Sequence, residues 1–241
     1  MQRIAKSVAI VVVAGGAMVF GASGARANLI LDPGFESPVI TFNWYENYGT
    51  YNGDSQYGGA SFDPNWVITS NNVDIVSSLT AGGNAPAIEG TQYLDLVGRG
   101  TTGGVQQTFA TVIGASYQLS FAYGNNPWST NTASASVTVY DTSGNILLDY
   151  VTHNTSTTTN LDWLSYSNTF IATSATTTLS FATTVGSNSG GILLDAVDVS
   201  GPSGNATTPL PAAWLTMMSG LAGMGLVARR RRKAGEKATA A

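Results

Sequence analysis

The stretch Tyr117-Gln118-Leu119-Ser120-Phe121-Ala122-Tyr123 decides the fold class, because its large apolar side chains fall at every second residue. Alternation of this kind is the period of a β-strand with one buried face. Val137 and Val139 repeat it further along the chain. Strands are therefore expected at Trp66–Val76, Gln92–Val97, Val105–Thr111, Tyr117–Tyr123, Ala133–Tyr140, Ile146–Val151, Trp163–Phe170, Thr176–Phe181 and Ile192–Val199.

Turn residues separate these stretches, and Asp141–Asn145 (DTSGN) between two of them predicts a hairpin. No segment between the two ends of the chain keeps a helical period, and Thr, Val, Tyr and Ile dominate the apolar stretches. The chain therefore predicts an all-β sandwich. Eight or nine strands favour a jelly roll over a seven-stranded immunoglobulin sandwich.

Three segments lack the strand pattern. Val39–Asp63 mixes aromatic residues with Asn, Gly and Ser, which predicts a long loop with a functional role. Thr152–Asn160 is rich in threonine, which predicts an exposed connection, and residues 201–208 (GPSGNATT) have the composition of a flexible linker.

The first 27 residues have the features of a signal peptide. Arg3 and Lys6 precede an uncharged apolar run, Val8–Phe20, and Ala25-Arg26-Ala27 matches the small-residue pattern before a signal-peptidase site. The run is shorter than the roughly 20 residues of a membrane-spanning helix. Cleavage is therefore expected between Ala27 and Asn28, with residues 28–200 forming one domain.

The last 33 residues predict a membrane-spanning helix. Residues 210–228 carry no charge and would form a helix roughly 28 Å long, close to the thickness of the hydrocarbon core. Arg229, Arg230, Arg231, Arg232 and Lys233 follow directly, which places this end and the tail 234–241 on the cytoplasmic side. Residues 28–208 would then lie outside the cytoplasm. A surface helix is disfavoured because the stretch is apolar all round.

This end of the chain, residues 209–233, resembles the PEP-CTERM sorting signal. The matching features are Pro209, Leu210 and Pro211, the apolar span, and the arginines at 229–232; Leu210 stands where the signal usually has glutamate. The resemblance implies that an exosortase cleaves near the prolines. The helix would then sit in the inner membrane only transiently, and the product would reach the cell surface or its exopolysaccharide matrix.

Charge and composition exclude several classes of function. The chain has 14 acidic and 10 basic residues, and the predicted signals contain every basic residue except Arg99. A nucleic acid needs several lysines and arginines, so such partners are disfavoured, while neutral glycans and divalent cations remain possible. Solubility alone also explains the acidity. The absence of cysteine and the single histidine exclude disulfides and thiolate or multi-histidine metal sites.

Several segments carry a second resemblance, in one order along the chain. They are Asn28–Pro38, Trp66–Val76, Glu89–Gly98, Val105–Asn126, Trp163 with Phe170, and Gly190–Ser200. Together they resemble the galactose-binding-like jelly rolls of carbohydrate-binding modules, and still more the DUF642 domain of plant cell-wall and bacterial surface proteins. The resemblance covers nearly all of residues 28–200 and implies the same β-sandwich.

By this resemblance, a structural calcium ion would join Glu36 to Asp195, with Asp32 or Asp198 as further ligands. Hard cations prefer such oxygen ligands. If the last strand is regular, Leu193 and Val197 share the face of Asp195, and a buried carboxylate needs a partner. The alternative is that Asp195 faces solvent or caps a backbone amide.

Sugar binding by such modules uses exposed aromatic rings with a few amides. The candidates here are Trp128 with its neighbours Asn125 and Asn126, and Trp44, Tyr45, Tyr48 and Tyr51 in the long loop. Trp128 is the strongest, because Pro127 holds it in a turn. The alternative is that the loop aromatics fold over the sandwich and complete its core. Trp66 and Trp163 lie within strand patterns and are expected in the core.

Catalysis has little support. His153 lies in the threonine-rich stretch without a serine motif nearby, which favours a solvated loop histidine. The carboxylates are scattered singly, although any two could support glycoside hydrolysis at the right spacing. Arg99 could hold an acidic sugar or pair with an aspartate. The leading hypothesis is a non-enzymatic exported protein that binds polysaccharide through loop aromatics; the alternatives are a structural matrix component and a glycan hydrolase.

Overall fold

The computed structural model describes residues 27–40, 44–51, 54–55, 62–79, 85–128, 132–187 and 189–202. The described residues form β-strands and connections and no helix, and in this part of the chain nothing is long and apolar enough to cross a membrane as a helix. The predicted membrane helix at 210–228 lies outside the described residues. So do the sorting signal, the cytoplasmic tail, most of the linker and the signal peptide up to residue 26.

The strands confirm the predicted fold class and most of the predicted positions. They are β1 (Tyr45–Tyr51), β2 (Asp54–Ser55), β3 (Val67–Ser77), β4 (Gln92–Asp95), β5 (Gly103–Ala110), β6 (Ser116–Asn125), β7 (Ala133–Asp141), β8 (Gly144–His153), β9 (Leu164–Ile171), β10 (Thr176–Val185) and β11 (Ile192–Ser200). Each of the strands β3 to β11 overlaps a predicted one. The predicted hairpin joins β7 to β8, with Asp141 opposite Gly144.

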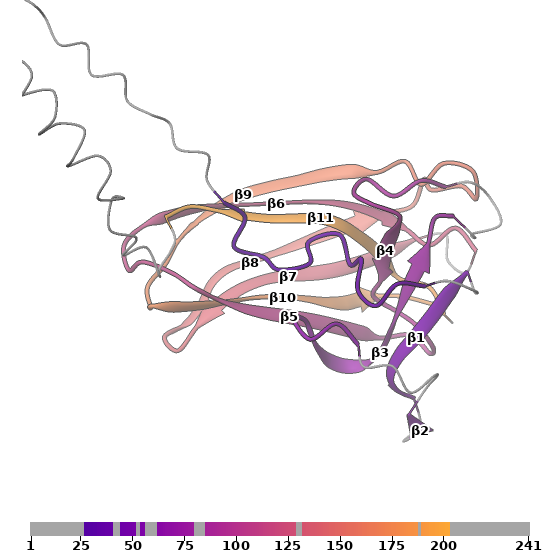
Figure 1. Cartoon of the computed structure of the whole chain (residues 1–241), viewed down its shortest axis with the longest axis horizontal. Coiled ribbons are helices and arrows are strands. Elements are labelled where there is room, and N and C mark those ends of the chain that lie inside the picture. Colours follow the sequence, from indigo (N-terminus) through magenta and orange to yellow (C-terminus); the bar gives the residue numbers. More distant parts are fainter. Residues whose placement is uncertain are drawn as a thin grey trace, which may run out of the picture.

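Two antiparallel layers make up the sandwich, and β3 belongs to both. One layer runs β8-β7-β10-β5-β3, and the other runs β3-β4-β11-β6-β9, with β1 beside β3. The first half of β3 pairs with β5 up to Asn71, and the second half pairs with β1 and β4 from Asn72 onward. Asn71 has a positive φ of 42° at this change of sheet. Figure 1 shows β1, β3 and β4 together at one end of the sandwich.

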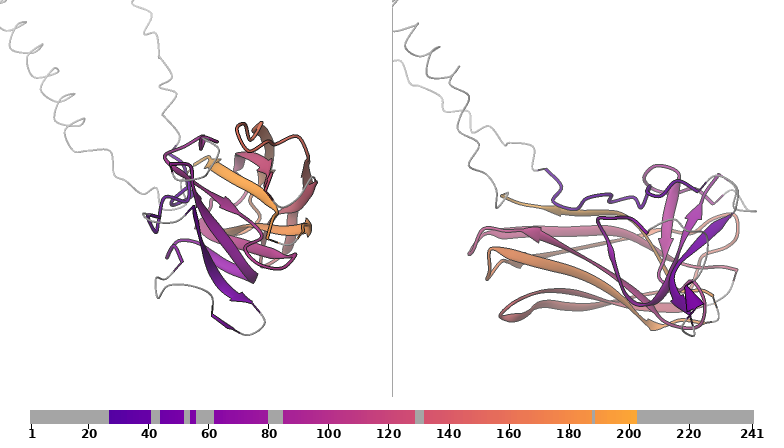
Figure 2. Two further views of the ribbon diagram at one scale, coloured as in Figure 1. Left: turned by 90° about the vertical axis from the view of Figure 1, so that its right-hand side faces the viewer. Right: turned by 60° about the horizontal axis from the view of Figure 1, so that its bottom comes forward.

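The segment before β1 ties the two layers together along one side (Figure 2). The Leu29 backbone N–H donates to the Val199 carbonyl oxygen on β11 at 2.9 Å. Two residues on, the Leu31 N–H donates to Oε1 of Gln107 on β5 at 2.7 Å. Asn28 also forms a bridge with Ser200, so both ends of the described domain lie at the end of the sandwich away from β1 and β4.

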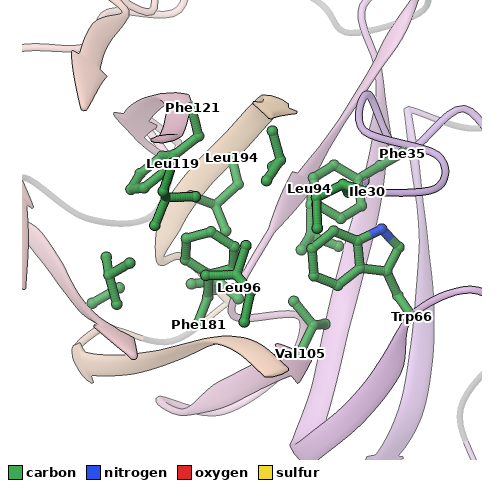
Figure 3. Close-up of a cluster of buried hydrophobic side chains, with 14 of the residues drawn as sticks. Ile30, Phe35, Trp66, Leu94, Leu96, Val105, Leu119, Phe121, Phe181 and Leu194 are labelled. Carbon is green, nitrogen blue, oxygen red and sulfur yellow. The ribbon is translucent and has the colours of Figure 1, made fainter. Parts of the chain in front are cut away.

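Aromatic contacts run through the core between the layers. The Phe35 ring lies 5.1 Å from that of Trp66, Trp66 lies 6.3 Å from Phe181, and Phe181 lies 5.0 Å from Phe121. Figure 3 shows these side chains with Leu94, Leu119 and Leu194 around them. The prediction that Trp66 belongs to the core is confirmed, since this side chain is buried.

Two loop predictions were wrong. Val39–Asp63 is not one long loop, because Tyr45–Tyr51 forms β1 and Asp54–Ser55 forms β2. His153 is buried at the end of β8 rather than solvated. Its ring nitrogens lie 2.7 Å from Asn125 Oδ1 and 2.8 Å from the Asp162 carbonyl oxygen, so the histidine joins β8 to β6 and to the following turn.

Trp163 and β11 also differ from expectation. Trp163 lies just before β9 and is only partly buried. Its Nε1–H donates to the Pro86 carbonyl oxygen. The strand β11 is irregular: a register shift between Asp195 and Asp198, with Ala196 at φ 51°, turns Val197 into the main core while Leu193 faces the other way.

Candidate functional site

The face of β3, β4 and β11 that points away from the main core carries a second apolar cluster. On β4, Leu94 belongs to the main core, whereas Tyr93 packs outward against Leu161 and Leu193. The ring of Tyr93 meets the Trp163 ring edge to face at 5.6 Å. All four residues of β4 are buried, which shows that loops cover this strand on its outer side as well.

The pairing register places two rows of side chains across this outer face. Tyr45 on β1 lies opposite Val76 on β3, and Val76 lies opposite Tyr93 on β4. The neighbouring row runs from Asn47 through Asp74 and Asp95 to Leu193. Side chains directly opposite each other have Cβ atoms about 5 Å apart, so each row forms a contiguous strip.

A pocket opens over these rows. We call it the aromatic pocket, and it is lined by Trp44, Tyr45, Asp74, Val76, Tyr93, Asn126, Trp128, Ser189 and Leu193. Its floor is formed by the strand residues Asp74, Val76, Tyr93 and Leu193. Trp44 and Tyr45 are each 53% exposed and Trp128 is 39% exposed, so three large rings from two distant segments of the chain stand at one opening.

A short hydrogen-bonded chain fixes Trp128 over the floor. The Trp128 backbone N–H donates to Asn126 Oδ1 at 2.8 Å, and Asn126 Nδ2 donates to Asp95 Oδ2 at 2.7 Å. The other oxygen of Asp95 accepts the N–H groups of Val97 and Gly191, both at 2.9 Å. Asp95 is fully buried, and its two oxygens therefore hold three connections in place around the pocket.

Burial dominates the electrostatics of the floor. Burial and the neighbouring charge of Asp95 raise the pKa of Asp74 to about 8, although Asn47 Nδ2 donates to its Oδ1 at 2.7 Å and the charge of Arg99 lowers it. Burial also raises the pKa of Asp95 to about 7, although the hydrogen bonds that this carboxyl group accepts lower it. The charge of Arg99 thus acts on Asp74, and the predicted ion pair of Arg99 with an aspartate stays a prediction.

Tyr93 has a buried polar atom that the protein leaves unpaired. Its hydroxyl oxygen has no hydrogen-bond partner, although the side chain is 0% exposed and lines the pocket. Buried polar atoms almost always find a partner, so such a group calls for an explanation. The sequence did not point to Tyr93, Asp74 or Asp95, because only the strand register brings them together.

The sequence matches a family model described as "Protein of unknown function (DUF642)" over residues 28–200. The chain belongs to the DUF642 family. No curated protein matches the sequence.

Solved structures similar to this DUF642 domain include TmCBM61 in complex with β-1,4-galactotriose, which is 16% identical, with a TM-score of 0.48 over 73% of this chain and 99% of that chain. The CBM22-1 xylan-binding domain of Paenibacillus barcinonensis Xyn10C is 16% identical, with a TM-score of 0.44 over 74% of this chain and 98% of that chain. The arabinose-bound α-L-arabinofuranosidase MgGH51 is 12% identical, with a TM-score of 0.48 over 76% of this chain and 27% of that chain. At these identities the likeness concerns the fold alone.

The DUF642 domain brings four of the predicted sugar-binding residues together and places two others elsewhere. Trp44, Tyr45, Asn126 and Trp128 line the aromatic pocket. Tyr48 is buried in the main core, with its ring 5.6 Å from Phe62 and its hydroxyl donating to Glu46. Asn125 is buried, and its Oδ1 is hydrogen-bonded to the His153 ring and to the Ser156 N–H, so it stabilises the fold. The side chain of Tyr51 lies outside the described residues.

The carboxylates predicted to bind calcium hold backbone amides instead. Glu36 Oε1 accepts the N–H groups of Thr91 and Gln92, both at 2.8 Å. Asp195 Oδ2 accepts those of Ile88 and Glu89 at 2.6 and 3.1 Å. We call this arrangement, Glu36 and Asp195 on the turn 88–92, the amide clamp.

The other two predicted ligands do not complete a cation site. The two oxygens of Asp32 accept the N–H groups of Glu36 and Ser37, and Asp198 lies half-buried opposite Ser120 on β6. Within the described ranges no three acidic or histidine side chains form a group that could hold a metal. Oxygens that face N–H donors do not suit a cation, so these residues do not fit the ion in this arrangement. Calcium binding stays a prediction.

Proposed function

We propose that this domain binds polysaccharide without catalysis, in the aromatic pocket. The observation that carries the proposal is the meeting of Trp44, Tyr45 and Trp128 at one opening above a floor that has buried polar groups. Ligand pockets are typically lined by apolar and aromatic side chains with a few polar groups that orient the ligand. Aromatic faces that stay exposed on a rigid scaffold suit the apolar face of a pyranose ring.

The carboxylates near the pocket do not suit hydrolysis, although the register places Asp74 opposite Asp95. A glycosidase needs one carboxyl group that donates a proton and a second that attacks the sugar or activates water. Both oxygens of Asp95 accept hydrogen bonds from the protein and the side chain is fully buried, so it has no free oxygen for either role. We therefore place the domain among binding modules.

We also propose that the protein works outside the cytoplasm, at the cell surface or in an exopolysaccharide matrix. Support comes from the signal-peptide pattern at residues 1–27 and the PEP-CTERM-like pattern at 209–233. Signal peptidase and an exosortase would be its processing partners. Mass spectrometry of the product secreted by the native cell tests this, since it should begin at Asn28 and end near Pro209.

A glycan array with the purified protein tests the binding function. Trp128→Ala and Trp44→Ala should each weaken binding at least tenfold without lowering the melting temperature, because both side chains are exposed. Tyr150→Ala is the matched control, since Tyr150 is an aromatic residue 60% exposed on β8 in the other layer.

Three results would contradict the proposal. If no glycan binds, the binding function fails, and self-association in that case would favour a structural matrix component. Release of sugar products that Asp74→Asn abolishes would show a hydrolase. Equal loss of binding in the Tyr150 and Trp128 variants would place the site elsewhere.

A further inference from the structure

We propose that the aromatic pocket selects neutral sugars and excludes glycans that carry carboxylates, with Tyr93 and Asp74 binding the sugar hydroxyl groups. The inference rests on the proposed binding function and deepens it. It follows from three features of the floor: an unpaired hydroxyl, a buried carboxyl group in the adjacent row, and the absence of basic side chains from the lining.

Tyr93 differs from the other buried tyrosines. The Tyr48 hydroxyl donates to Glu46 at 2.8 Å, and the Tyr117 hydroxyl donates to the Pro202 carbonyl oxygen at 2.7 Å while accepting the Val112 N–H. Tyr93 alone among these three has no partner. Leaving a buried hydroxyl unpaired destabilises the folded state. Because Tyr93 lines the pocket, a small movement of the side chains that cover its hydroxyl lets a hydroxyl group of a bound sugar supply the missing partner.

Asp74 is placed to bind a neighbouring sugar hydroxyl. It lies on β3 beside Val76, and Val76 lies opposite Tyr93, so the carboxyl group and the unpaired hydroxyl belong to adjacent rows of one floor. Its Oδ1 is held by Asn47, and the backbone of Gly98 lies so close that an added Cβ would come within 2.8 Å of the same oxygen. The carboxyl group is thus fixed before a ligand arrives, which lowers the entropic cost of binding.

A carboxylate on the glycan would be the third acidic group in this buried cluster. Burial and the neighbouring Asp95 already raise the pKa of Asp74, and a uronic acid would meet the same desolvation and repulsion. Sites for acidic sugars use arginine or lysine to offset these costs. No such residue lines the pocket, and Arg99, the one basic residue in the described part of the chain, already acts on Asp74.

Isothermal titration with matched ligands tests the inference. The probes are neutral trisaccharides of galactose, glucose and mannose and their uronic-acid counterparts, which differ only by a carboxylate at C6. At least one neutral probe should bind ten or more times tighter than its acidic counterpart. At pH 9, above the pKa of about 8 that burial gives Asp74, Asp74→Asn should narrow this ratio at least threefold, because it removes a charge and keeps the shape.

Tyrosine variants form the second arm. Tyr93→Phe should weaken the neutral probe about five- to tenfold without lowering the melting temperature, since the hydroxyl has no partner in the protein. Tyr117→Phe is the control, which should lower the melting temperature and leave affinity unchanged, because its hydroxyl is bonded far from the pocket.

The possible failures are distinguishable. Equal or tighter binding of a uronic acid would overturn the inference and leave the binding function intact. Unchanged affinity in Tyr93→Phe would show that the hydroxyl holds only a water molecule and would overturn its role. If the wild type binds neither a neutral nor an acidic probe and no glycan on the array, the proposed function itself fails.

Discussion

Two groups of carboxylates lie in and beside one sheet, the amide clamp at β11 and the pocket floor on β3 and β4, and they differ in how their oxygens are used. In the amide clamp, Asp195 accepts the N–H groups of Ile88, Glu89 and Ala196, and Glu36 accepts two more from the turn 88–92. In the pocket floor, the Asp74 carboxyl group accepts from Asn47 Nδ2, and the hydroxyl of Tyr93 in the adjacent row has no partner.

The carboxylates of the amide clamp stabilise the fold, whereas the polar groups of the pocket floor keep a hydrogen-bonding position free for a ligand. Hydrogen bonds to backbone amides lock the turn 88–92 against β11, and removing such an acceptor leaves several donors unpaired. An unpaired polar atom at a pocket forms its hydrogen bond only when a ligand binds. Substitutions in the clamp should therefore change stability, whereas those in the floor should change binding.

The largest effect is expected in the clamp. Asp195→Ala should lower the free energy of unfolding by about 3 kcal/mol, because three partly buried N–H groups lose their acceptor and a buried cavity is left. Urea denaturation measures this. Asp198→Ala, at the first paired position after the bulge and half-buried, is the control and should cost less than about 0.5 kcal/mol. A similar loss of unfolding free energy in both variants would show that the clamp hydrogen bonds stabilise the fold no more than Asp198 does.

The next effect concerns pH. Burial raises the pKa of Asp74 to about 8 and that of Asp95 and Asp195 to about 7, above the value near 4 of an unfolded chain. Between about pH 4 and pH 8 the folded state therefore binds more protons than the unfolded state. The stabilisation that these carboxyl groups provide is fully present below about pH 4 and is lost as the pH rises through 7 to 8. Melting temperature should fall between pH 5 and pH 8.5.

The same experiment with Asp74→Asn sharpens the comparison. The variant removes one of the groups that take up protons, so its melting temperature should fall less over that range, by the equivalent of about 1–3 kcal/mol at pH 8.5. A melting temperature that rises toward pH 8.5 in the wild type would contradict the burial of these carboxyl groups.

A smaller effect separates two tyrosines. Tyr117→Phe should lower the free energy of unfolding by about 1–1.5 kcal/mol, since its hydroxyl accepts the Val112 N–H and donates to the Pro202 carbonyl. Tyr93→Phe should not lower it, because no hydrogen bond is lost and an unpaired buried hydroxyl is removed. Thermal denaturation of both variants measures the difference, and an equal loss would mean that the Tyr93 hydroxyl has a partner within the protein.

The smallest effect concerns calcium. Because the oxygens of Glu36, Asp195 and Asp32 accept amide hydrogens, EDTA should leave the melting temperature within about 1 °C of its value in calcium. The Asp195→Ala variant, measured alongside, shows how large a shift the clamp can produce. A rise of several degrees on adding calcium to the chelated protein would restore the ion predicted from the sequence.

The sequence predicted the sandwich well, because strands such as β6 and β7 carry much of their burial in alternating side chains. It missed β1, whose residues YENYGTY mix inward and outward aromatic groups: Tyr48 faces the core while Tyr45 stays exposed. Gly49, with φ at 105°, further breaks the pattern. His153 was misplaced because its threonine-rich neighbours suggested solvent, whereas partners distant in sequence bury it.

The site was predicted in part. Trp44, Tyr45, Asn126 and Trp128 were identified because exposed aromatic groups in turns are visible in a sequence. Asp74 and Asp95 were not, because each is a single carboxylate in its own strand and only the register makes them neighbours. QYLD gave no such signal for Tyr93, because it mixes Gln92 and Asp95 with Tyr93 and Leu94, and only the structure shows that all four are buried.

The bridge between Asn28 and Ser200 brings the two ends of the domain together at the end of the sandwich remote from β1 and β4. Whatever holds the protein by either end therefore holds it by the same side. The aromatic pocket, which is the proposed binding site, then points away from the attachment, and neither attached segment has to pass across it. A tether at one end and a fusion partner at the other can coexist with an occupied site, which makes the domain suited to display on a surface.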